Sequence, residues 1–91
     1  MNHSIELLVG LGNPGARYAG TRHNAGQDLV SLFCQQSSIE LASESRFFGR
    51  VGEAQYGGKK LRILIPEIFM NRSGQSVCAL AAFYKIDPNN I

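Results

Sequence analysis

The chain has 91 residues, of which 44% are apolar and 18% are charged, and its formal net charge is +2. This length allows one domain spanning residues 1–91, and the apolar share supports a packed core and excludes a disordered chain. The weak positive charge is compatible with a nucleic-acid partner but does not indicate one.

The first residues show no targeting or membrane pattern. Residues 1–4 read as a loose terminus, and no apolar segment of signal-peptide or membrane-spanning length follows Met1. We therefore expect a cytoplasmic protein with no membrane partner. A strand is expected at Ile5–Val9, where the nearly continuous apolar run is typical of burial on both faces.

A turn rich in glycine and proline follows this strand, with the sequence Gly10-Leu11-Gly12-Asn13-Pro14-Gly15. The glycines permit positive φ angles and close backbone approach, and the proline fixes one φ angle. A turn of this kind directly after a buried strand usually serves to hold polar side chains in fixed positions. The polar side chains available here are Asn13, Tyr18, His23 and Asn24.

A helix is expected from Asn24 to about Gln36. Asn24 suits the N-cap position, and Gln27 follows three residues later as in a capping box. The positive end of the helix dipole disfavours a charged imidazole, so a neutral His23 could accept a proton from water. The amide of Asn13 could orient that water or stabilise an oxyanion. Taken alone, a histidine before a helix is more often a capping or surface residue. The preceding glycine-rich turn favours the interpretation of His23 as a general base.

The two cysteines carry no metal or redox spacing. Cys34 and Cys78 are far apart, and each lies within an apolar helical pattern, so we expect buried free thiols. With two dispersed cysteines and two histidines, we expect no metal site. The apolar stripe of the first helix is expected at Ala25, Leu29, Val30 and Phe33.

The middle of the chain predicts a β-hairpin. Residues 39–41 are either a short strand or part of a linker. Strands are expected at Phe47–Tyr56 and Lys59–Ile65, and Gly57-Gly58 between them is a strong hairpin signal. Leu61, Ile63 and Ile65 alternate along the second strand and mark a core face. We assign the Phe47-Phe48 pair to core packing rather than to base stacking.

A second helix is expected after Pro66, entered through Phe69-Met70-Asn71 and ended by Asp87-Pro88. Residues 89–91 read as the approach to a further strand. The apolar stripe of this helix is expected at Val77, Leu80, Ala81 and Tyr84.

The pattern contains two strand-then-helix units, which predict parallel neighbours in a mixed α/β sheet flanked by helices. Because ligands bind beyond the carboxyl ends of strands in such sheets, Asn13, His23 and Met70-Asn71 should line one crevice. The helix start at Asn71 would add free N–H groups suited to a carbonyl or phosphate oxygen. Two plainer alternatives stay open: Asn71 as a helix cap and Met70 as ordinary packing, although an exposed methionine also suits a pocket for varied side chains.

Two of these segments resemble a known family. Residues 10–15, Tyr18 and residues 21–26 (Thr-Arg-His-Asn-Ala-Gly) resemble the N-terminal signature of the bacterial-type peptidyl-tRNA hydrolases. Residues 69–74 (Phe-Met-Asn-Arg-Ser-Gly) resemble that family's second signature, and Phe47-Phe48-Gly49 fits between them. The similarity extends in order over essentially the whole chain.

The resemblance implies a three-layer α/β/α fold and a hydrolase that cleaves the ester between a peptide and the 3′ ribose of tRNA, without a metal or an organic cofactor. His23 matches the family's general base. Asn13 and Asn71 match residues that hold the substrate and position the reacting groups. Tyr18 and Met70 match residues lining the site, and Asn24 matches its polar wall.

The resemblance also implies a truncated domain, because family members continue for about as many residues again. Their histidine-orienting carboxylate, a further asparagine and most of their tRNA-binding basic residues would follow Ile91. Loss of such an orienting carboxylate costs several orders of magnitude in rate in other enzymes. We therefore expect this chain alone to be weak or inactive. We also expect it to self-associate through open sheet edges, although the full-length family is expected to be monomeric.

Two alternatives remain. Residues 10–15 also spell the G-x-G-x-x-G pattern of dinucleotide-binding domains, although that motif needs a helix to open within the turn, and Glu40 comes too late to bind the ribose. The other alternative is a non-catalytic domain that binds the tRNA end or a peptide in the same crevice.

Overall fold

The structure is a computed structural model that describes residues 5–12, 25–56, 58–67 and 72–91. In chain order its elements are β1 (Leu7–Val9), α1 (Ala25–Gln36), β2 (Ala42–Glu44), the 3₁₀ turn η3 (Ser45–Phe47), β3 (Gly49–Tyr56), β4 (Lys59–Pro66), α2 (Ser73–Tyr84) and the 3₁₀ turn η5 (Pro88–Asn90). Neither helix in this described part is long and apolar enough to cross a membrane.

The four strands form one mixed sheet in the order β1-β4-β3-β2. β1 pairs with β4 in parallel, with Leu8 opposite Ile63, and the other two pairings are antiparallel. The predicted parallel neighbours and the predicted hairpin are therefore confirmed. β1 and β2 are the outer strands of this sheet, and pairing of two copies along them stays a prediction.

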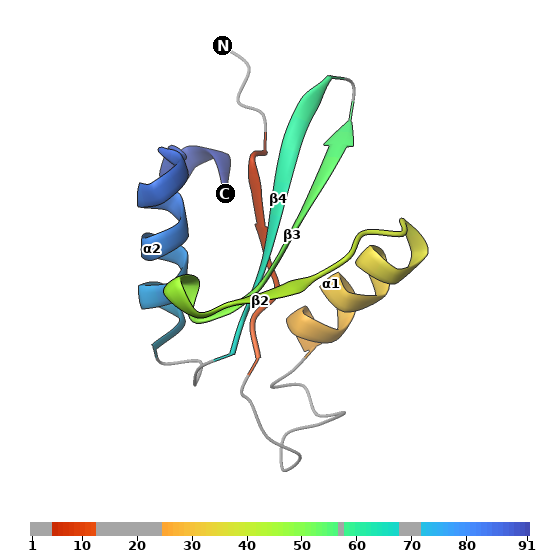
Figure 1. Cartoon of the computed structure of the whole chain (residues 1–91), viewed down its shortest axis with the longest axis horizontal. Coiled ribbons are helices and arrows are strands. Elements are labelled where there is room, and N and C mark those ends of the chain that lie inside the picture. Colours follow the sequence, from red (N-terminus) through yellow and green to blue (C-terminus); the bar gives the residue numbers. More distant parts are fainter. Residues whose placement is uncertain (1–4, 13–24, 57, 68–71) are drawn as a thin grey trace.

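The sheet lies between the two helices, which makes three layers (Figure 1). Ile63 and Ile65 of β4 pack with Val30 and Cys34 of α1 on one face. Leu64, which points to the opposite face, packs in a cluster on the α2 side. The other buried members of that cluster are Leu7, Phe47, Leu80 and Ile86. Both faces of β4 are thus core, whereas the alternation of its residues had marked only one.

The predicted second helix has the expected core face. Leu80 is fully buried, and Val77, Ala81 and Tyr84 pack against its cluster. The predicted stripe of α1 was only partly right. Val30 is buried and Phe33 packs against the α1-side cluster, but Ala25 is exposed and Leu29 is 69% exposed. One narrow row of α1 touches the sheet, and it continues through Cys34 rather than through Leu29.

The hairpin forms at the expected place, with Tyr56 opposite Lys59 and Gly58 at a φ angle of 80°. Its first strand begins later than predicted. Phe47 ends η3 and is buried, as expected, whereas Phe48 has left-handed backbone angles and is 46% exposed, so its assignment to the core was wrong. The possible strand at residues 39–41 is displaced to β2, which begins at Ala42.

The end of the described chain forms a turn instead of the approach to a strand. Pro88 occupies the first position of η5, where its fixed φ angle suits a helical turn. The carboxylate of Asp87 accepts the N–H of Asn89 at 2.9 Å and caps this turn.

Candidate functional site

The carboxyl ends of β1 and β4 lie side by side. Val9 is opposite Leu64, and the N–H of Gly10 donates to the carbonyl of Leu64 at 3.0 Å. Because the two strands are parallel, the chain leaves both at the same edge of the sheet. The described starts of α1 and α2 lie toward this edge, which is the lower end of the view in Figure 1. The two predicted motifs therefore depart from neighbouring points, as the strand-then-helix pattern indicated.

The predicted site residues themselves lie outside the described residues. These are Asn13, Tyr18, His23, Asn24, Met70 and Asn71. The crevice that they are expected to line stays a prediction. The structure describes the segments on both sides of these residues, which form the framework of the expected site.

On the first side, the exit of β1 packs tightly on the first turn of α1. A Cβ on Gly10 would lie 2.8 Å from the Cβ of Val30, and a Cβ on Gly26 would lie 3.2 Å from backbone atoms of Leu11. The carbonyl of Leu11 accepts the N–H of Gln27 at 2.9 Å. Close packing of β1 on α1 therefore explains why glycine is needed at positions 10 and 26. A phosphate-binding interpretation does not require this packing.

That same hydrogen bond modifies the predicted capping box. The Gln27 N–H is the donor that the capping box assigned to the side chain of Asn24, and it bonds to Leu11 instead. At the second helix, the structure corrects the expected start at Asn71. α2 begins at Ser73 with Arg72 as its N-cap residue, and Arg72 makes no side-chain capping hydrogen bond.

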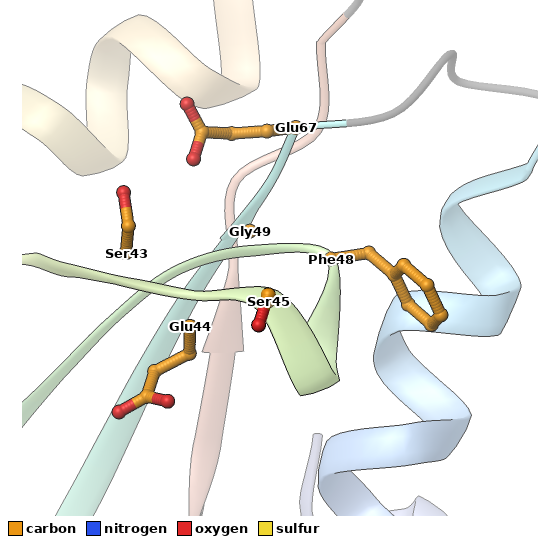
Figure 2. Close-up of a pocket in the computed structure, with 6 residues that line it drawn as sticks. All are labelled: Ser43, Glu44, Ser45, Phe48, Gly49 and Glu67. Carbon is orange, nitrogen blue, oxygen red and sulfur yellow. The ribbon is translucent and has the colours of Figure 1, made fainter.

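On the second side, the end of β4 is held by the turn that precedes β3. The N–H of Glu67 donates to the carbonyl of Phe48 at 2.8 Å. A cavity of about 380 Å³ lies around this junction. It is lined by Ser43, Glu44, Ser45, Phe48, Gly49 and Glu67, and Figure 2 shows the Phe48 ring on the α2 side and the Glu67 carboxylate turned toward α1. The sequence offered a partial signal for this turn, because a glycine follows the two phenylalanines.

The ionisable groups near this junction do not form a catalytic set by themselves. Glu67 lies 3.8 Å from the Arg50 guanidinium, and its side chain is half exposed, so this ion pair adds little stability. Burial raises the pKa of the Cys34 thiol, against the opposing effect of the positive Arg50, so this thiol is a poor nucleophile at neutral pH. Among the described residues, no group of three His, Cys, Asp or Glu side chains could hold a metal ion.

Comparisons with known proteins connect this framework to a family. The family model described as peptidyl-tRNA hydrolase matches residues 7–91. The peptidyl-tRNA hydrolase of Psychromonas ingrahamii is 52% identical over 91 residues, which are 100% of this chain and 46% of that protein. That of Mannheimia succiniciproducens is 52% identical over 87 residues, which are 96% of this chain and 45% of that protein.

The fold agrees with that of solved structures. A crystal structure of peptidyl-tRNA hydrolase from Acinetobacter baumannii superposes with a TM-score of 0.91 at 44% sequence identity, and the match covers 100% of this chain and 47% of that one. The chain thus spans about half the length of the relatives that it matches. Since the family model covers nearly every residue and the solved fold coincides with the described sheet and helices, the chain belongs to the peptidyl-tRNA hydrolase family.

Proposed function

We propose that this chain carries the general base and two positioning amides of a site that hydrolyses peptidyl-tRNA. The reaction breaks the ester between the peptide, or an N-blocked aminoacyl group, and the 3′ ribose, and releases tRNA for reuse in translation in the cytoplasm. The observation that carries this proposal is the family match over residues 7–91. The adjacent carboxyl ends of β1 and β4 support it, because the two motifs depart from them.

In the proposed mechanism, a neutral His23 takes a proton from water as the water oxygen attacks the ester carbonyl. Asn13 and Asn71 hold the substrate and donate hydrogen bonds to the oxygen on which negative charge develops. The ribose oxygen then leaves with the electron pair of the ester bond and takes the proton that His23 removed from water, which restores the neutral imidazole. Tyr18 and Met70 line the pocket. An ester has a better leaving group than an amide, so one water, one base and a few donors are a plausible minimum.

Asn24 is assigned to the polar wall beside His23. None of these steps uses a metal, an organic cofactor or a covalent enzyme intermediate. The full-length relatives contain about as many residues again, and the orienting carboxylate that the family resemblance implies would lie among them. We therefore propose that turnover by this chain is far slower than turnover by the longer Psychromonas relative.

The test is release of free tRNA from N-acetyl-phenylalanyl-tRNA by the chain, by its His23→Ala variant and by the Psychromonas relative. A general base typically contributes about 10²–10⁴-fold, so His23→Ala should reduce kcat by about that factor and leave binding of the tRNA end largely intact. Release at equal rates by wild type and His23→Ala would reject the proposed base.

The other functional classes give different results in the same set of measurements. Saturable binding of the tRNA end without any release by wild type would identify a non-catalytic binding domain. Saturable binding of NAD would identify a nucleotide-binding module, because such binding is not expected of a hydrolase of this family.

A further inference from the structure

The connection between β4 and α2 is held at both ends by one turn. At its start, the N–H of Glu67 donates to the carbonyl of Phe48 at 2.8 Å. At its end, the hydroxyl of Ser76, in the first turns of α2, donates to the carbonyl of Phe47. Two consecutive carbonyls therefore bind the two elements that flank residues 68–71.

The backbone of this turn lets neighbouring carbonyls serve different elements. Phe48 has φ 58° and ψ 36°, a left-handed conformation that is uncommon for a bulky residue and costs energy. It is fixed by its own N–H, which donates to the carbonyl of Ser45, and by burial of the preceding Phe47. At Gly49, a Cβ would lie 2.8 Å from the Cα of Pro66, so only glycine permits this close approach to the end of β4.

Ser76 is the side-chain component of this arrangement. It is fully buried, and its hydroxyl donates to the Phe47 carbonyl. Ser73, one turn earlier on α2, is also buried, but its hydroxyl has no hydrogen-bond partner within the described part of the chain. The two serines are thus a matched pair of buried residues, of which Ser76 makes the hydrogen bond to the Phe47 carbonyl and Ser73 does not.

We propose that Ser76 is a positioning residue that, through the Phe47-Phe48 turn, holds α2 in a fixed position relative to the end of β4. Met70 and Asn71 lie between these two elements in the sequence. Glu67, directly after β4, and Ser76, within α2, donate to consecutive carbonyls of the same short turn, which restricts how β4 and α2 can move relative to each other. The consequence for catalysis rests on the proposed function, in which the amide of Asn71 must be held in place when the substrate binds.

Amide hydrogen exchange of the whole chain tests the structural part. Ser76→Ala removes the hydroxyl but keeps a strong helix former, so α2 should still form. Losing one hydrogen bond should speed exchange by about fivefold at Glu67 and at residues 77–79, whose N–H groups are the first in α2 with an acceptor four residues earlier. Ser73→Ala should leave these rates within about twofold of wild type, since its hydroxyl bonds to none of the described residues.

Kinetics of N-acetyl-phenylalanyl-tRNA hydrolysis test the functional part. We expect Ser76→Ala to lower kcat by about tenfold with KM changed less than about twofold, because positioning acts on the reacting geometry. Ser73→Ala should retain wild-type kcat, and circular dichroism should report equal helix content for both variants.

The outcomes separate the two proposals. Exchange in Ser76→Ala that matches exchange in Ser73→Ala overturns the positioning by the turn, whatever the activity. Faster exchange with unchanged kcat overturns the catalytic consequence. If wild type and His23→Ala release tRNA at equal rates, the proposed function fails, while the exchange comparison still decides whether Ser76 holds α2 to the turn.

Discussion

The two cysteines differ in burial, and this difference should set their reactivity. Cys34 is 2% exposed in the α1-side core, where burial raises the pKa of its thiol, whereas Cys78 is exposed on α2. Because the thiolate is the reactive species, Cys78 should react with a chromogenic disulfide reagent at pH 7.5 and Cys34 should react only after unfolding.

Single-cysteine variants assign the two phases. Cys34→Ser should retain the fast phase and Cys78→Ser should retain the slow one, with both thiols reacting at once in denaturant. A fast reaction of native Cys78→Ser, whose remaining thiol is that of Cys34, would contradict the burial of Cys34.

At the scale of single residues, the burial predicted from the sequence was wrong where polarity did not distinguish the faces of a helix. Cys78 was expected to be buried because it lies in an apolar helical pattern. The segment from Ser73 to Tyr84 contains no charged residue, and its two serines are buried while Cys78 is exposed, so polarity did not show on which face Cys78 lies. The structure decides the matter by packing one row, which includes Leu80, against the sheet.

At the scale of elements, the contact between β1 and α1 depends on a missing side chain. A Cβ on Gly10 would meet the Val30 side chain at 2.8 Å and the Gly26 carbonyl at 3.1 Å. Gly10→Ala should therefore reduce the free energy of unfolding by about 1–3 kcal/mol through overpacking. Urea unfolding followed by circular dichroism measures this change.

Gly74→Ala is the matched control for that substitution. A Cβ on Gly74, in the first turn of α2, would meet no atom of the described residues within 4 Å, apart from its chain neighbours and the helix's own backbone. Alanine there should raise the free energy of unfolding by about 0.5–1 kcal/mol, because it restricts the unfolded chain and favours the helix. Equal effects of the two substitutions would contradict the close approach of β1 to α1.

The type of an element was predictable where turn residues or an apolar periodicity gave a clear local signal. The Gly57-Gly58 hairpin and both helices follow from turn residues and periodicity, and the structure confirms them. The turn at Phe48 was not predictable, because phenylalanine rarely takes a positive φ angle and looked like the start of a strand. Tertiary hydrogen bonds from Glu67 and Ser76 to this turn hold that conformation, and no local pattern shows them.

At the scale of the whole molecule, connectivity was the most predictable property. Two strand-then-helix units predicted that β1 and β4 would be parallel neighbours, and this places the departures of both motifs at one sheet edge. The predicted crevice depends on the side chains of Asn13, His23 and Asn71, which belong to connecting segments outside the described residues. It therefore stays a prediction, although the sheet topology that it requires is confirmed.

The two ends of the described chain meet at β1, and this closure should contribute measurably to stability. The N–H of Glu6 donates to the Asn90 carbonyl at 2.7 Å, and the Asn90 side-chain amide donates to the Glu6 carboxylate at 2.6 Å. Asn90→Ala removes the charge-assisted bond and should reduce the free energy of unfolding by about 1.5–3 kcal/mol at pH 7. Urea unfolding at fixed pH provides the measurement.

Asn90→Asp gives the same contact a pH signature that a loss of packing would not produce. At pH 7 the new carboxylate faces that of Glu6, so this variant should be less stable than Asn90→Ala. As the pH falls, protonation of facing carboxylates removes this repulsion, so the variant regains stability at low pH. The gap between the two variants should therefore narrow in urea unfolding between pH 7 and pH 4. A gap that does not depend on pH would mean that the side chains of residues 6 and 90 do not meet, and that the backbone bond alone joins η5 to β1.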